Sequence, residues 1–244
     1  MSSEIIFENV SFSYGEKIVF NNLNIRIPLG CNVALVGENG AGKSTLIKLI
    51  LGLHTPQRGN IFIENKKISE LSAKEKKELF AVAFQDFYRY PLSLRENLSL
   101  CLDKSENEEK YAEVLKTVGL VDLVARLDDK IGKYGEHSLE LSDGQWQKIA
   151  LARVLISKAK VLILDEPTAS MDPVSESNLY HSFMGIMQSR GTIIITHRMA
   201  LAKYADVIIV IKDGEVNGIG KHSDLLSQSN YYSMLYKRQS EWYQ

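Results

Sequence analysis

A glycine-rich loop between an apolar strand and a helix is the strongest constraint on the fold of this 244-residue chain. The loop reads GENGAGKS over residues 37–44, follows the apolar segment Asn32–Val36, and opens a predicted helix over Lys43–Leu51 that ends at Gly52. Glycines let consecutive backbone N–H groups point at one anion without interference from a Cβ atom. The positive end of the helix dipole faces the same point. The segment therefore predicts a phosphate-binding loop in an α/β fold.

The spacing of this loop, G-x-x-x-x-G-K-S, predicts a nucleotide site. Lys43 is expected to reach the β- and γ-phosphates, and the Ser44 hydroxyl is expected to ligate Mg²⁺. The candidate binding residues of the loop are Gly37, Asn39, Gly40, Ala41, Gly42, Lys43, Ser44 and Thr45.

The order of strands and helices predicts the rest of the fold. Short apolar segments over Ile5–Val10, Val19–Ile27 and Gly59–Glu64 indicate β-structure before residue 85, and amphipathic helices are expected over Glu106–Val118 and Ser142–Ser157. After residue 160 strands and helices alternate. The expected strands there are Val161–Leu164, Thr192–Thr196 and Val207–Ile211, and the expected helices are Pro173–Arg190, Met199–Tyr204 and the tail Asp224–Tyr243.

This pattern predicts one α/β domain over residues 1–244, with a P-loop nucleotide-hydrolase core, a mainly parallel sheet, an N-terminal antiparallel β subdomain and an inserted α-helical subdomain. The core is expected over about 1–85 and 160–244, and the helical subdomain over about 86–159.

Two carboxylates follow the apolar strand Val161–Leu164. Ligands of open α/β sheets lie at the carboxyl ends of the strands. Asp165 is therefore expected to hold Mg²⁺, directly or through water, and Glu166 to orient or deprotonate an attacking water.

A second motif, Leu141-Ser142-Asp143-Gly144-Gln145, opens the predicted helix with a Ser-x-x-Gln capping box, which is also an anion site. At this motif the chain resembles the ATP-binding cassette family, in particular the nucleotide-binding domain of ABC transporters. The resemblance covers nearly the whole chain. It implies that Ser142, Gly144 and Gln145 meet the γ-phosphate of ATP held by a second subunit.

The same resemblance assigns further roles. Tyr14 is expected to stack on adenine, Gln85 to contact the Mg²⁺ and water site, and His197 to contact the γ-phosphate. It implies ATP and Mg²⁺ as cofactors. The expected catalytic residues are Glu166, His197, Gln85 and Lys43, and the expected metal ligands are Ser44, Gln85 and Asp165.

Two positions depart from the family pattern. Asp143 stands where glycine is common, and a carboxylate there would repel a phosphate if it pointed inward. We expect it to point outward, where it favours the helix dipole. In Ser170-Met171-Asp172, which matches the D-loop, methionine replaces the usual leucine.

Residues 84–98 and 214–236 resemble the exporter branch of the family, and residues 144–150 are similar to bacterial peptide and lantibiotic exporters. The resemblance implies head-to-tail dimerisation driven by ATP, with a second cassette of the same or another kind. It also implies a transmembrane partner, fused in the native chain, and a place at the cytoplasmic face of the cell membrane.

Two alternatives stay open. An importer cassette would be marked by a neighbouring permease gene and binding-protein gene. A soluble ABC ATPase acting on DNA or ribosomes usually carries coiled coils or tandem cassettes, which this sequence lacks. The net charge of -1 also argues against a nucleic-acid partner.

Overall fold

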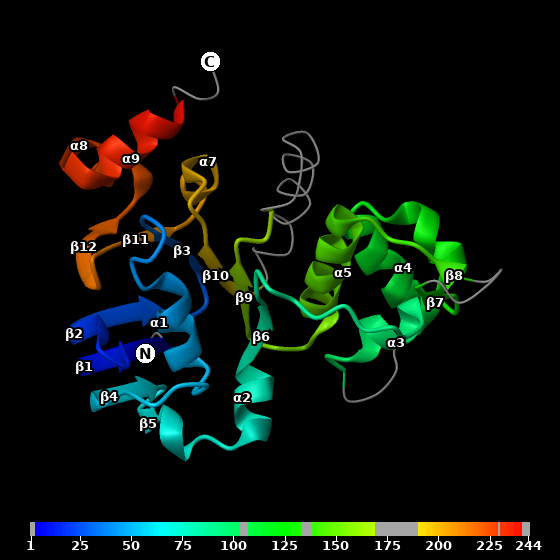
Figure 1. Cartoon of the computed structure of the whole chain (residues 1–244), viewed down its shortest axis with the longest axis horizontal. Coiled ribbons are helices and arrows are strands. Elements are labelled where there is room, and N and C mark those ends of the chain that lie inside the picture. The colour runs from blue at the N-terminus through cyan, green and yellow to red at the C-terminus, as the bar shows by residue number, and fades with distance from the viewer. Residues whose placement is uncertain (1–2, 103–106, 133–137, 169–189, 229, 241–244) are drawn as a thin grey trace.

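A parallel sheet carries the phosphate loop. In the computed structural model, which describes residues 3–102, 107–132, 138–168, 190–228 and 230–240, a six-stranded sheet has the order β12-β11-β3-β10-β9-β6 (Figure 1). Its strands are β3 (Asn32–Val36), β6 (Phe80–Ala83), β9 (Val161–Asp165), β10 (Gly191–Ile195), β11 (Val207–Lys212) and β12 (Glu215–Gly220). β3 pairs in parallel with β10 and β11, and only β12 runs antiparallel to its neighbour. Because these central strands are buried on both faces, they read as continuous apolar runs.

A second sheet, antiparallel, lies beside the first. It has the order β2-β1-β4-β5, with β1 (Glu4–Tyr14), β2 (Lys17–Pro28), β4 (Arg58–Ile63) and β5 (Lys66–Lys67). Helix α1 (Lys43–Ile50) shares one hydrophobic core with both sheets. Leu46, Ile47, Leu49 and Ile50 are each 0 % exposed, so α1 and the loop that precedes it are fixed from both sides.

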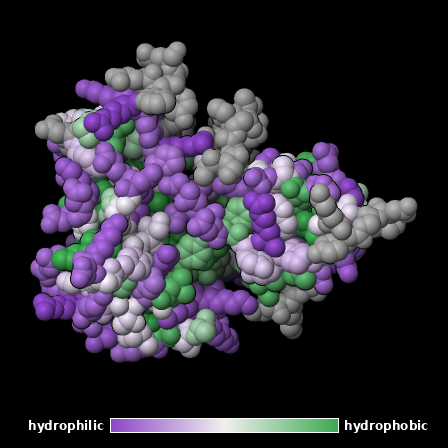
Figure 2. Space-filling view, viewed as in Figure 1, coloured by the Kyte–Doolittle hydropathy of each residue, from purple (hydrophilic) through white to green (hydrophobic). Residues whose placement is uncertain are grey.

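Residues between β6 and β9 form a helical lobe, whose hydrophobic core includes side chains of β6, β9 and β10 (Figure 1). Its elements are α3 (Leu94–Ser99), α4 (Glu108–Thr117), the 3₁₀ helix η2 (Val121–Arg126), the short strands β7 (Lys130–Ile131) and β8 (Ser138–Leu139), and α5 (Asp143–Ile156). Hydrophobic side chains reach the surface along the depression between this lobe and the strand-rich part of the molecule (Figure 2).

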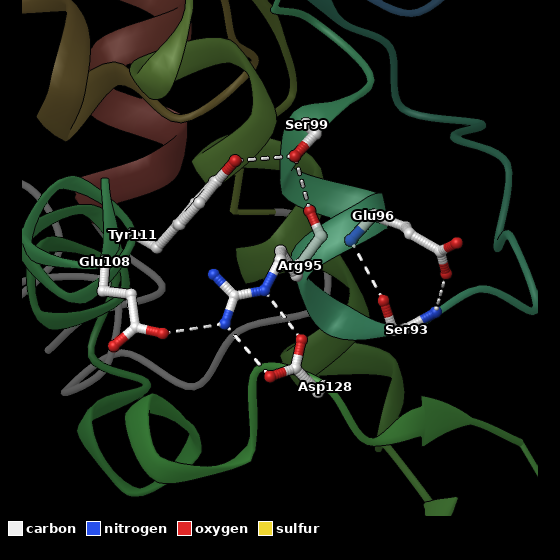
Figure 3. A network of polar contacts seen from close by, with 7 residues as sticks. All are labelled: Ser93, Arg95, Glu96, Ser99, Glu108, Tyr111 and Asp128. Atoms are coloured by element: carbon white, nitrogen blue, oxygen red, sulfur yellow. Dashed lines mark hydrogen bonds and ion pairs between the residues drawn. The ribbon is translucent and has the colours of Figure 1, made fainter. Parts of the chain in front are cut away.

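Arg95 ties three segments of the helical lobe together (Figure 3). Its guanidinium donates two hydrogen bonds to Asp128, of 2.7 and 3.0 Å, and one of 3.0 Å to Glu108. It also lies 5.7 Å from the centre of the Tyr111 ring, whose hydroxyl is 2.7 Å from Ser99 Oγ. Such bidentate pairs have defined geometry, so α3 is held at a set angle to α4 and η2.

The remaining helices lie at two opposite ends of the strand-rich part of the molecule (Figure 1). η1 (Ile68–Glu70) and α2 (Ala73–Leu79) connect β5 to β6, and α7 (Met199–Ala202), α8 (His222–Gln228) and α9 (Asn230–Ser240) pack near β3 and β11. In the described residues no helix is long and apolar enough to cross a membrane.

The predicted fold class is confirmed: mixed α/β with an antiparallel N-terminal sheet and parallel core strands. Strand and helix bounds differ by a few residues from those expected, most at β1, which extends to Tyr14. The expected helix Pro173–Arg190 lies outside the described residues except for Arg190, and so does the D-loop match Ser170-Met171-Asp172.

Candidate nucleotide site

Two glycines allow the phosphate loop its path. Gly37 has φ +154°, and a Cβ atom there would lie 2.1 Å from the carbonyl oxygen of Ile211. Gly42, at the start of α1, has φ +108°, and a Cβ atom there would lie 2.9 Å from the ring of Phe20. Both the dihedral angle and the lack of space require glycine, so the loop closes against β11 and β2.

Lys43 lies inside this loop. Its side chain is buried, and its ammonium donates hydrogen bonds of 2.8 Å to the Gly37 carbonyl and 2.9 Å to the Glu38 carbonyl. Burial lowers the pKa of Lys43, while the nearby carboxylates Glu166 and Asp165 raise it. The ammonium therefore sits inside the loop, between two backbone carbonyls and two acidic side chains.

A cleft of about 310 Å³ opens beside the loop. It brings together residues from β1, β2, α1, the segment after β6 and the end of β9. The residues that line it are Tyr14, Lys17, Val19, Asn39, Gly40, Gly42, Lys43, Ser44, Thr45, Gln85 and Glu166.

Tyr14 stands at one end of the cleft, at the tip of the β1–β2 hairpin opposite Lys17. Its ring is 43 % exposed and contacts Phe12 and His54 edge-to-face, with ring centres 4.9 and 5.3 Å apart. A half-exposed aromatic ring supported by two others is suited to stacking on a planar base.

Asp165, the last residue of β9, is buried and accepts a hydrogen bond from the Ser44 side chain. Burial raises its pKa, and the bond from Ser44 opposes that shift. Its Oδ1 atom has no hydrogen-bond partner among the residues that the structure describes. A buried carboxylate oxygen without a partner is costly unless a cation or water meets it, and Ser44 and Asp165 are hard oxygen donors, so this pair fits Mg²⁺.

Glu166 directly follows Asp165, the last residue of β9, and its backbone takes the left-handed conformation, with φ 49°. Its N–H donates to the Ile195 carbonyl at 3.0 Å, and its own carbonyl accepts from Gln147 Nε2 at 3.3 Å. Both contacts hold an unfavourable dihedral angle in place, which is typical of functional sites.

The Glu166 side chain pairs with His197, with 3.0 Å between Oε1 and Nδ1. This hydrogen bond lowers the pKa of Glu166 and raises the pKa of His197. The pair comes from the ends of β9 and β10, which are neighbours in the sheet. An ionised carboxylate is thus kept beside the phosphate loop, as a proton acceptor requires.

Residues 141–145, called the signature segment from here on, do not line this cleft. Ser142 caps α5: its Oγ accepts from the Gln145 N–H at 3.2 Å, and Gln145 Oε1 accepts from the Ser142 N–H at 2.9 Å. Asp143 is 75 % exposed in its side chain and pairs with Arg89 at 2.9 Å. Within the described part of the chain, the cleft beside Lys43 is lined by none of residues 141–145.

The structure thus gathers Tyr14, the loop residues, Gln85, Asp165, Glu166 and His197 around one cleft, and leaves Ser142, Gly144 and Gln145 apart from it. Gly37 and Ala41 shape the loop rather than line the cleft. Sequence reasoning missed Lys17, Val19 and Gln147. Register across the β1–β2 hairpin could have indicated Lys17, because it faces Tyr14.

A phosphate loop that opens α1, with two acidic residues at the end of β9, which β10 separates from β3 in the sheet, defines a P-loop nucleotide-binding protein. A family model described as ABC transporter matches residues 20–169, so the chain belongs to the ABC transporter family.

Curated relatives support this assignment. The chain is 39 % identical over 235 residues to the nisin transport ATP-binding protein NisT of Lactococcus lactis subsp. lactis, an alignment that covers 93 % of this chain and 39 % of the relative. It is 37 % identical over 256 residues to the subtilin transport ATP-binding protein SpaT of Bacillus subtilis, covering 98 % of this chain and 42 % of the relative. The chain therefore spans about two-fifths of the length of these relatives.

A solved structure of a bacterial Atm1-family ABC exporter with ATP bound is also similar. The TM-score is 0.89 with 27 % sequence identity, and the match covers 98 % of this chain and 42 % of that one.

Proposed function

We propose that this chain is the ATP-binding and ATP-hydrolysing domain of an ABC exporter. The observation that carries the proposal is the separation of two half-sites. One is the phosphate cleft, and the other is the capped start of α5, which does not line that cleft. Each half-site needs a partner, and a head-to-tail pair of cassettes supplies both. The core over about 1–85 and 160–244 would hold the cleft, and the helical subdomain over about 86–159 would present the helix end.

In this proposal the described side chains have distinct tasks. Lys43 and the loop N–H groups bind the β- and γ-phosphates, and Tyr14 stacks on the base. Glu166 accepts the proton of the attacking water, while His197 holds the Glu166 side chain in place. Ser44, Asp165 and Gln85 would hold Mg²⁺, which when bound neutralises charge on the phosphate oxygens.

Ser142, Gly144 and Gln145 of a second cassette would close over the γ-phosphate. ATP then joins two subunits, and its hydrolysis releases them. A transmembrane partner that prefers one of these two arrangements would be driven between orientations. In this proposal the cassette lies at the cytoplasmic face of the membrane.

The relatives favour export over the importer and soluble alternatives. Two of them are named for transport of nisin and of subtilin, and the similar structure is an exporter. We therefore propose a peptide of the lantibiotic kind as the cargo of the whole transporter.

The Glu166→Gln variant tests the proposal, because it keeps the shape of the cleft and removes the proton acceptor. We expect ATP binding to be retained and turnover to fall about 100-fold or more. Light scattering should then detect a dimer trapped in saturating ATP and Mg²⁺. Glu215→Gln, at an exposed position on β12, is the matched control and should behave as wild type. Wild-type turnover in Glu166→Gln, or a monomer in saturating ATP, would contradict the proposal.

A further inference from the structure

Helix α9 contacts the backbone on both sides of Arg198, directly after His197. The carboxamide of Gln239 makes both contacts. Its Oε1 accepts from the Met199 N–H at 2.7 Å, and its Nε2 donates to the His197 carbonyl. One side chain near the end of α9 therefore fixes two backbone groups of the segment that carries His197.

The same helix also reaches the phosphate loop. Arg238 lies 3.5 Å from the carboxylate of Glu38, and Tyr231 hydrogen-bonds to the backbone of Glu38. A cavity of about 210 Å³ lies between these contacts. It is lined by Gly37, Glu38, Asn39, His197, Met199, Leu235 and Gln239.

α9 is anchored independently of Gln239. Tyr232 is 0 % exposed, its hydroxyl is 2.8 Å from His222 Nδ1, and it belongs to a core cluster with Met199, Val36 and Val210. A helix held by a buried aromatic side chain is a firm base for the Gln239 contacts.

His197 itself has little packing to hold it. Its side chain is 45 % exposed, and its Glu166 contact of 3.0 Å depends on where the backbone after β10 lies. Thr196 gives some local order, since its Oγ1 accepts from the Arg198 N–H at 2.9 Å. Gln239 adds hydrogen bonds to the His197 carbonyl and to the Met199 N–H.

We infer that Gln239 is a positioning residue that sets the distance between His197 and Glu166, and through it the rate of ATP hydrolysis. This inference rests on the proposed function. It adds that α9, which also contacts the phosphate loop at Glu38, acts through Gln239 on the hydrolysis step and not on ATP binding.

The test compares steady-state kinetics of the full chain with ATP and Mg²⁺. We expect Gln239→Ala to lower kcat about fivefold, through loss of two hydrogen bonds, and to leave KM within about twofold. Gln239→Glu can still accept from Met199 but cannot donate to His197, so it should lower kcat by a similar factor. The side chain keeps its size in this variant. Gln228→Ala, an exposed glutamine on α8, is the matched control and should keep the wild-type rate.

A double-mutant cycle separates positioning from a general loss of stability. In the His197→Ala background, measured by single turnover of labelled ATP, Gln239→Ala should have no further effect, because the two residues act as a unit. An equal loss in both backgrounds would overturn the inference, as would a wild-type kcat in Gln239→Ala and Gln239→Glu.

Failure of the proposed function and failure of this inference give different results. A wild-type chain that binds ATP but never hydrolyses it, even at high protein concentration, would overturn the proposed function together with this inference. An active wild type whose rate is unchanged in both Gln239 variants would overturn the inference alone.

Discussion

Tyr14 is partly exposed and is held by two other rings, which suits a residue that must remain available to a ligand. Phe12 and His54 hold the ring edge-to-face while 43 % of it stays exposed at the cleft. Tyr14→Ala should therefore weaken ATP affinity about three- to tenfold, the value of one aromatic stack. Titration with a fluorescent ATP analogue measures this. Tyr88→Ala, at a ring that is 68 % exposed and away from the cleft, should have no effect. Equal affinities in the wild type and Tyr14→Ala would reduce Tyr14 to a packing role.

Asp143 lies in the first turn of α5, where an acidic side chain favours the helix dipole, and the structure shows that it pairs with Arg89 at 2.9 Å. In the proposed dimer Arg89 offsets a negative charge beside the partner's phosphates. Arg89→Ala should raise the ATP concentration needed for dimerisation about threefold at low salt, and less at high salt because exposed charges are screened.

The second substitution Asp143→Asn in the Arg89→Ala chain should restore the wild-type requirement. Analytical ultracentrifugation of both variants at two salt concentrations is the measurement. A defect in Arg89→Ala that is unaffected by salt and by Asp143→Asn would count against charge compensation.

At the scale of elements, helix α2 depends on a charged cap. Glu75 accepts from the Ser72 N–H at 2.9 Å and pairs with Lys66 at 3.0 Å. The backbone bond to Ser72, and after it the bond to Lys66, lower the pKa of Glu75 from 4.5 to about 2. A carboxylate whose pKa is lower in the folded state stabilises the fold at pH values above its ordinary pKa. This contribution is lost as the pH falls toward the pKa of the folded state.

Glu75→Gln should therefore destabilise the chain at pH 7 and pH 5, and the difference from wild type should shrink between pH 4.5 and about 2. Urea unfolding at several pH values tests this. Glu78→Gln on the same helix is the control, since its exposed ion pair with Lys74 spans 4.0 Å. A difference that stays constant with pH would show that packing, not charge, explains the effect.

Elements with a clear period or cap were predictable from the sequence. α5 begins where Ser142 and Gln145 indicate, and β9 ends at Asp165. α2 was not predicted although Ser72 and Glu75 form a capping box, because six of its seven residues are not buried and give no apolar period. β12 was missed for a related reason: it has no buried residue, and its pairing with β11 defines it.

The site residues also fall into two groups, those that the sequence indicated and those that only the structure shows. Residues of the phosphate loop and of the acidic pair lie close together in the sequence, so spacing alone indicated them. Gln147 meets Glu166, and Gln239 meets His197, through packing of separate elements. Such contacts leave no local pattern, so only the structure shows them.

At the scale of the whole molecule, two separated half-sites predict complementation between inactive chains. Lys43→Ala damages the cleft and leaves the signature intact. Gly144→Asp adds a carboxylate near the partner's phosphates, yet an acidic residue in the first turn of α5 still favours the helix dipole. Alone, each variant should be inactive. In an equal mixture, head-to-tail pairs contain one intact composite site, so about a quarter of the wild-type rate should return.

The measurement is ATP hydrolysis by the two variants, separate and mixed, over a range of protein concentrations. The mixed rate per molecule should rise with concentration. A mixture as inactive as its components would mean that the two motifs do not act across one interface.

The neighbours of β3 have a consequence for how this chain is made. The strand that ends at the phosphate loop is flanked in the sheet by β10 and β11, which begin at residues 191 and 207. A ribosome working from the N-terminus releases the loop long before either flanking strand exists. The nascent chain must therefore carry an unfinished nucleotide site from the synthesis of the loop until β10 and β11 have been made. ATP in the cell can stabilise the chain through this site only once translation has passed β11, so ligand binding follows completion of the sheet around β3.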